Sequence, residues 1–353
     1  MITFKSSFNA KEFSCSVPDV VLTTSAEHVD VLITATKGTE VDTVFNERLF
    51  PDATGTIEII EVDRLIESYA EQWLVFTLKV QVTEAASTEH SDLETQVVSC
   101  KANILNTTAA DFCNTRFLTL LEGIRPTSKG WLEFLTYIGT EQASCTAYYD
   151  DDTTGQFNVQ RTTVNNDYSM IDVSPDNFLQ DGKQLLRYVI SAGQRTQEYE
   201  VLQDSDPDVA PILLFFNSFG VQELAYCMGE HQMVSSYDRK QARIGRKKQN
   251  YSIEEKSTFK ADTGYLTYPM ASWWREVLRS KDVQVMQLAE DGTIDQNSGL
   301  PVVINTEKVE LSNEAAHMPR FTFEYEYADR NHNIVMEWRE GRIFDNTFDY
   351  TFN

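Results

Sequence analysis

The fold is indicated by the stretch Val29-Asp-Val-Leu-Ile-Thr-Ala-Thr36, in which Val29, Val31, Ile33 and Ala35 occupy every second position. Successive side chains of a β-strand point to opposite faces, so such a run has one buried and one solvated face. The same period of two returns in residues 74–83 and 321–327. The chain is therefore predicted to be mainly β, built of antiparallel β-sandwiches with a few short helices.

Length and turn signals divide the chain into three predicted domains. Residues 1–105 have the size and strand pattern of an immunoglobulin-like or fibronectin-like sandwich. Residues 106–208 are expected to form a second β domain, ending in an acidic, proline-containing linker at about 203–211. Residues 209–353 are expected to form a mostly antiparallel α+β domain with an extended aromatic tail at 336–353.

Two segments break the strand pattern and are predicted to be helical. In the first, Asp63 is expected to cap a short helix whose apolar face holds Leu65, Ile66, Tyr69 and Ala70. The second begins at Pro269, a residue that suits the first helical turn. Its apolar stripe consists of Met270, Trp273, Trp274, Val277 and Leu278. We also expect a hairpin in the middle domain, formed by residues 185–191 and 196–202.

The net charge limits the kinds of partner that the chain can bind, and the cysteines indicate the compartment in which it folds. The chain has 30 Lys and Arg against 54 Asp and Glu, a formal net charge of −24. This balance repels nucleic-acid phosphates and anionic membranes, and no apolar run is long enough for a membrane span. The start of the chain lacks the pattern of a secretion signal. The cysteines form no Cys-x-x-Cys pair and are expected to be reduced, buried thiols of a protein folded in a cytoplasm: Cys15, Cys100, Cys113, Cys145 and Cys227.

The sequence contains no motif of a catalytic or metal-binding centre. Its five histidines lack metal-ligand spacing, and Glu230-His231 is interpreted as a solvated turn. Asp204, Asp206 and Asp208 lack the glycine and closing glutamate of a calcium loop. We therefore expect a protein that is not an enzyme and that holds neither a metal nor a cofactor.

One segment is opposite in charge to the rest of the chain. Residues 239–248 crowd together six basic side chains: Arg239, Lys240, Arg243, Arg246, Lys247 and Lys248. We expect them in a loop between two strands. The cluster is either a hairpin tip kept soluble by its charge or a docking loop for an acidic neighbour, such as another copy of this chain.

The last residues are unusually aromatic for a chain end. Phe348, Tyr350 and Phe352 alternate with polar residues, as in a strand. This tail either returns to its own sheet or adds a strand to the sheet of a neighbouring subunit. The candidate interface residues of the tail are Trp338, Phe344, Phe348, Tyr350 and Phe352.

Several segments together are similar to tail-region proteins of phages and prophages from gut bacteria. In the C-terminal domain, the similarity rests on Leu214-Phe-Phe-Asn-Ser-Phe-Gly-Val-Gln-Glu223, Thr258-Phe-Lys-Ala-Asp-Thr-Gly264, Trp273-Trp274 and residues 319–331. In the N-terminal domain, it rests on Phe45-Asn-Glu-Arg-Leu-Phe-Pro51, Ile57-Glu-Ile59 and Leu65-Ile66. The resemblance covers about two-thirds of the chain, and the family supplies no catalytic residues to transfer.

The resemblance implies a structural protein of the virion, in the tail tip or baseplate, assembled in the host cytoplasm. Its partners would be copies of itself and other tail proteins. Such proteins act through docking of identical subunits, often in rings. The alternative is an adhesin that binds a carbohydrate or receptor through exposed aromatic platforms, with Trp131, Trp273, Trp274 and Trp338 as candidates. For Trp273 and Trp274, packing in the core is the preferred interpretation.

Overall fold

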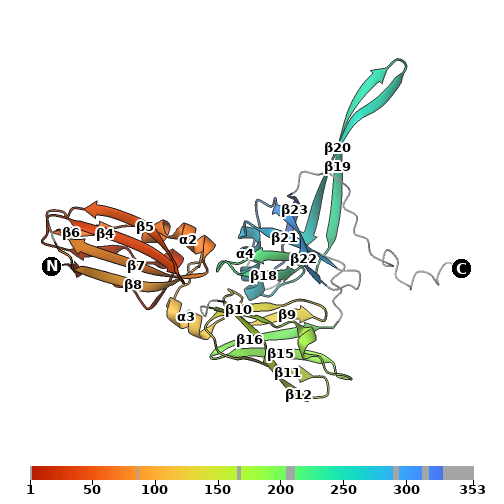
Figure 1. Cartoon of the computed structure of the whole chain (residues 1–353). Helices are drawn as coiled ribbons and strands as arrows, with labels where there is room; N and C mark the ends of the chain where they lie inside the picture. The colour runs from red at the N-terminus through yellow and green to blue at the C-terminus, as the bar shows by residue number, and fades with distance from the viewer. Residues whose placement is uncertain are drawn as a thin grey trace.

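The computed structural model describes residues 2–85, 87–164, 168–203, 211–288, 294–311 and 318–328. Within these residues the chain is mainly β, and its sheets fall into three groups along the sequence (Figure 1). The described helices are short: α1 (Val62–Leu65), α2 (Glu67–Gln72), α3 (Ala109–Thr115) and α4 (Tyr268–Arg279). The predicted class, antiparallel sandwiches with a few short helices, is confirmed.

The first group of strands forms a sandwich of two sheets. One sheet has the order β1-β3-β6 and the other the order β2-β8-β7-β4-β5. Only the pairing of β2 with β8 is parallel. This is the strand arrangement of an immunoglobulin-like sandwich. The strands are β1 (Thr3–Phe4), β2 (Lys11–Phe13), β3 (Val20–Thr23), β4 (Val29–Lys37), β5 (Glu40–Leu49), β6 (Thr56–Ile59), β7 (Val75–Glu84) and β8 (His90–Val98).

The alternation in the first sandwich has its expected consequence. Val29, Val31, Ile33 and Ala35 of β4 are all fully buried in the core between the sheets. The predicted helix is displaced, however. Asp63 lies inside the first turn of α1, and the residue before that helix is Glu61, which has a positive φ of 58° and makes no side-chain cap. The chain therefore buries Val62, Ile66 and Ala70, and leaves Leu65 at the surface.

The second group of strands repeats the strand order of the five-stranded sheet but not that of the three-stranded sheet. Its five-stranded sheet has the order β12-β11-β15-β16-β9, and its first strand, β9, again runs parallel to the last, β16. The facing sheet has the order β10-β14-β13. The predicted hairpin is β15 and β16. The strands are β9 (Ile124–Ser128), β10 (Phe134–Ile138), β11 (Ala143–Tyr149), β12 (Thr154–Val159), β13 (Arg161–Val164), β14 (Tyr168–Asp172), β15 (Leu185–Ala192) and β16 (Arg195–Leu202).

The third group is one antiparallel sheet of order β18-β17-β21-β22-β23-β20-β19, with α4 packed against it. Thr267 caps α4, its hydroxyl accepting a hydrogen bond from the amide of Met270. Trp273 and Trp274 pack in the core with Phe215 and Phe323. The strands are β17 (Ile212–Phe216), β18 (Gln222–Tyr226), β19 (His231–Ile244), β20 (Lys247–Asp262), β21 (Val283–Leu288), β22 (Ile294–Ile304) and β23 (Thr322–Tyr327).

The three units meet around a cluster of phenylalanines. Phe219, before β18, stacks on Phe112 of α3 with ring centres 5.3 Å apart, and Phe13 of β2 packs edge-on against Phe112 at 5.6 Å. The amide of Lys101 donates a hydrogen bond to the carbonyl of Ser218. The first and third units are also joined by an ion pair of 3.1 Å between Glu71 and Lys281.

Two further expectations concern thiols and membranes. All five cysteines are free, and four are buried, but Cys15 is exposed, which corrects the expectation of five buried thiols. Cys15 lies in a 3₁₀ turn (Ser14–Ser16) that directs Ser14 inward and leaves its neighbour at the surface. None of the helices that the structure describes has the length and hydropathy for crossing a membrane.

Candidate interaction surface

The most prominent surface feature is a long hairpin, which we call the arm, formed by β19 and β20 (residues 231–262). Its two strands pair from His231 and Ala261 to Ile244 and Lys247, with one register shift between Lys240 and Gln241. A two-residue turn closes it, with Gly245 at a positive φ of 64°, a conformation that glycine adopts without steric cost. The arm projects from the edge of the third sheet, well beyond the other strands (Figure 1).

The outer part of the arm exposes large apolar side chains. Ile244 is 68 % exposed, Tyr251 69 % and Ile253 56 %. Met233, Val234 and Tyr237, nearer the body, are also exposed. A two-stranded hairpin alone is marginally stable in water, and clustered exposed apolar groups mark interaction sites. The arm therefore has the character of a surface that a partner covers.

The six predicted basic residues come together at the end of the arm. They do not form a loop, which corrects the sequence expectation: Arg239, Lys240 and Arg243 belong to β19, Lys247 and Lys248 to β20, and only Arg246 is in the turn. Strand pairing continues to the tip because the turn needs just two residues. Residues 239–253 include no acidic side chain.

The charges at the tip are not balanced within the arm. Arg239 stacks on Tyr237, and Lys240 lies 3.5 Å from Glu254, but Arg243 is placed directly opposite Lys248. Like charges in directly opposed positions destabilise a strand pair. Among the residues that the structure describes, no ion pair involves Arg243, Arg246, Lys247 or Lys248. An anionic partner would therefore stabilise the tip.

The base of the arm is held firmly to the body. His231, expected in a solvated turn, instead begins β19, and its Nε2 lies 2.9 Å from the hydroxyl of Tyr325. Phe259 stacks on Tyr325 with ring centres 5.1 Å apart. At the end of β20, Asp262 accepts hydrogen bonds from Arg320 at 2.6 Å and from Thr322 at 2.9 Å. The arm is thus anchored at one end and uncovered at the other.

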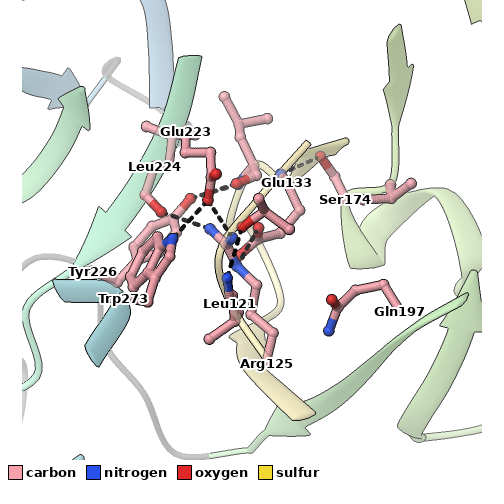
Figure 2. Close-up of polar contacts among 12 residues, drawn as sticks. Leu121, Arg125, Glu133, Ser174, Gln197, Glu223, Leu224, Tyr226 and Trp273 are labelled. Carbon is pink, nitrogen blue, oxygen red and sulfur yellow. Dashed lines mark hydrogen bonds and ion pairs between the residues drawn. The ribbon is translucent and has the colours of Figure 1, made fainter. Parts of the chain in front are cut away.

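A second polar site, missed in the sequence, lies buried between the second and third units (Figure 2). Arg125 of β9 pairs with Glu133 at 2.9 Å and with Glu223 of β18 at 3.1 Å. Its guanidinium also donates to the carbonyl of Leu224 at 2.6 Å and lies over the ring of Trp273. The indole N–H of Trp273 donates to Glu223 at 2.9 Å. These contacts join α4 and β18 to the middle sandwich.

Burial shapes the ionisation of this site, since Arg125, Glu133 and Glu223 are all at most 5 % exposed. Desolvation raises the pKa of Glu133 to about 7, although the charge of Arg125 opposes this shift. For Arg125, burial lowers the pKa, but the charges of Glu133 and Glu223 outweigh it and the net shift is upward. Desolvation also raises the pKa of Glu276 in α4 to about 7. Arg125 therefore stays charged, and this cluster serves as an interdomain connection.

The aromatic residues considered as binding platforms in the sequence are either buried or outside the described residues. Trp131, Trp273 and Trp274 are at most 3 % exposed, so they are not surface platforms for a glycan. Trp131 stacks on Tyr226 with ring centres 3.8 Å apart, across the same interface. Asp204, Asp206 and Asp208 lie outside the described residues. So do the candidate interface residues of the tail, which are Trp338, Phe344, Phe348, Tyr350 and Phe352.

The described part of the chain offers no group of three or more His, Cys, Asp or Glu side chains arranged for a metal ion.

The sequence indicated the arm through its reversal of charge, because the basic residues are neighbours in the sequence. No comparable signal marks the Arg125 cluster, because its members are far apart in the sequence, from Arg125 to Trp273.

No protein-family model and no curated protein matches the chain. Among solved structures, it is similar to the I-band fragment I67-I69 from titin, with 12 % identity, 74 % of this chain and 92 % of that chain covered, and a TM-score of 0.18. It is also similar to the endo-fucoidan hydrolase MfFcnA4_H294Q from glycoside hydrolase family 107, with 11 % identity, coverage of 58 % and 29 %, and a TM-score of 0.17. Similarities at this level carry no conclusion about function.

Proposed function

We propose that this protein is a structural subunit of a larger assembly and that it docks to an acidic protein surface through the arm. The observation that carries the proposal is the projecting hairpin, whose outer part combines uncovered apolar side chains with six basic ones. In such docking, contact between apolar side chains supplies the binding affinity. Complementary charge selects the partner and increases the rate of association.

The chemistry of the arm favours another copy of this chain as the first partner. The whole chain carries 54 acidic against 30 basic residues, and six of the basic residues are concentrated between positions 239 and 248. The remaining surface of each copy is thus strongly acidic. An arm that reaches a neighbouring copy would meet the opposite charge, and head-to-tail contacts of this kind generate rings or filaments.

The connections between the units support a role based on shape. The Arg125 cluster joins the second unit to the third, and the stack of Phe219 on Phe112 joins the third unit to the linker region. Such buried contacts favour a stiff body that presents the arm in a constant direction. We propose that the protein acts by contact between subunits and not by catalysis.

The resemblance to tail-region proteins gives the proposal its biological form. Segments from both the first and the third unit carry that resemblance, including Leu214–Glu223 and Phe45–Pro51. We therefore propose the tail tip or baseplate of a phage as the assembly, and the virion as the location.

The test compares two variants with equal loss of positive charge. One carries Arg243→Gln, Arg246→Gln and Lys248→Gln in the arm; the control carries Arg48→Gln, Arg64→Gln and Lys308→Gln on the body, where the side chains are exposed. Sedimentation velocity at low and high salt measures association of each. We expect the arm variant to lose association that the control retains, and high salt to weaken association of the unmodified chain.

Equal association of both variants at every salt concentration would refute docking through the charged tip. If the unmodified chain sediments as a monomer at all protein concentrations, self-association is refuted. In that case, pull-down of purified neighbouring tail proteins with the unmodified chain and with the arm variant distinguishes a different partner from no role of the arm.

A further inference from the structure

Two thiols from distant parts of the first unit lie side by side. The Sγ of Cys15 and the Sγ of Cys100 each donate to the carbonyl oxygen of Ala102, both at 3.2 Å. Two sulfur atoms that share one hydrogen-bond acceptor lie near each other, as formation of a disulfide requires.

The backbone around the two thiols is held in place on both sides. The hydroxyl of Ser14 donates to the carbonyl of Cys100 and accepts from the amide of Cys100, at 3.0 Å in each case. Next to this pair, β2 lies parallel to β8, with Phe13 opposite Val98. The segments that carry Cys15 and Cys100 are therefore fixed against each other before any bond forms between the sulfur atoms.

The environments of the two thiols differ in a way that suits sequential oxidation. Cys15 is exposed, whereas Cys100 is 1 % exposed. Interaction with the Cys100 thiol lowers the pKa of Cys15, and the same interaction, with burial, raises the pKa of Cys100. The thiolate is the nucleophile in thiol chemistry, so Cys15 is the thiol that an oxidant in solution meets first.

We propose that Cys15 and Cys100 form a peroxide-sensitive thiol pair that closes to an intramolecular disulfide. In the first step, the Cys15 thiolate attacks one oxygen of hydrogen peroxide, the O–O bond breaks, and hydroxide leaves as Cys15 becomes a sulfenic acid. In the second step, the sulfur of Cys100 attacks that of Cys15, the S–O bond breaks, and the thiol proton and hydroxyl leave as water. Two electrons pass from the thiols to the peroxide.

The location of the pair gives such a bond a mechanical consequence. Cys100 directly precedes Lys101, whose amide bonds to Ser218 of the third unit. Cys15 follows Phe13, which packs against Phe112 and Phe219. A disulfide would tie the turn that follows β2 to the segment that follows β8, at the junction of all three units. Oxidation would therefore stiffen this junction.

The experiment treats the reduced full-length protein with hydrogen peroxide, quenches it and counts thiols after denaturation. We expect the count to fall from the five of the sequence to three, with a mass lower by two hydrogen atoms and a linked peptide pair containing Cys15 and Cys100. Reductant should restore all five thiols. The melting temperature should rise on oxidation and return on reduction, because the bond restricts the unfolded chain.

Variants identify the pair. Cys15→Ser alters an exposed side chain, so the protein is expected to fold, and it should keep its four thiols under the same treatment. The matched control is Cys145→Ser, in the core of the second sandwich, which should still lose two thiols. A disulfide between two chains, a link to a different cysteine, or sulfinic acid at Cys15 with Cys100 still a thiol would each overturn the proposal.

Discussion

Arg125 and Glu223 are 98 residues apart in the sequence, yet they form an ion pair of 3.1 Å in which both side chains are almost completely buried. The pair crosses the boundary between the middle sandwich and the third unit. A buried ion pair is not in itself strong support for stability, because both charges lose their hydration. Because both side chains are buried, removal of either one would leave the other buried without its charge partner.

Arg125→Met should destabilise the protein strongly. The change leaves Glu133 and Glu223 buried without their cation, and loss of one partner of a buried pair costs about 3–5 kcal/mol. Chemical denaturation at neutral pH measures this loss. The exposed pair of Arg48 and Asp30 provides the control, since Arg48→Met should cost about 1 kcal/mol or less.

A combined variant separates loss of charge balance from loss of packing. Adding Glu133→Gln and Glu223→Gln to Arg125→Met removes all three buried charges, so the triple variant should recover part of the stability that the single variant lost. A triple variant less stable than Arg125→Met would show that the unpaired charges are not the source of the cost.

Glu276→Gln should change the dependence of stability on pH. Burial raises the pKa of Glu276 from its usual 4.5 to about 7 in the folded protein. Its contribution is therefore fully present below about pH 4.5 and is lost as the pH rises through 7, because the carboxyl must then ionise while buried. The loss is on the order of 3 kcal/mol, since one pKa unit corresponds to about 1.4 kcal/mol.

The glutamine variant keeps the oxygen that accepts a hydrogen bond from the amide of Ser218 and cannot ionise. Its free energy of unfolding should exceed that of the unmodified protein at pH 8 by more than at pH 5. Denaturation curves at the two pH values measure the difference. The same excess at both pH values would mean that Glu276 does not ionise in the range expected.

Lys248→Glu should stabilise the arm while weakening docking. It replaces a repulsion with Arg243, directly opposite, by an attraction, a gain of about 0.2–1 kcal/mol. Amide hydrogen exchange of peptides from residues 240–250 should slow, and association measured by sedimentation should weaken. Lys248→Gln, which removes the repulsion alone, should give intermediate exchange rates.

Phe219→Ala should weaken the connection among all three units. Phe219 is fully buried and packs against Phe112 and Phe13, so its truncation should cost about 3–5 kcal/mol. We expect the thermal transition to broaden or split, because the first sandwich can then unfold separately. Phe50→Ala, at a residue 65 % exposed, is the control and should change stability by about 0.5 kcal/mol or less.

Sequence patterns predicted best those elements whose burial repeats over short distances. The alternation at Val29–Ala35, the hairpin of β15 and β16, and the helix at Pro269 were all predicted from neighbouring residues, and the structure confirms them. The prediction that Asp63 caps a helix was wrong, because the burial of Val62 against the sandwich core determines where that helix begins. The charge of the arm was visible, but its length as a paired hairpin was not.

The class of the protein and the faces of its strands thus follow from local order along the chain, since a period of two forces one side of a strand into the core. The strand order shared by the two five-stranded sheets, the proximity of Cys15 and Cys100, and the cluster around Arg125 depend on contacts between distant residues. Such contacts arise when folding removes side chains from water, and burial then selects which of the many charged and polar residues are paired.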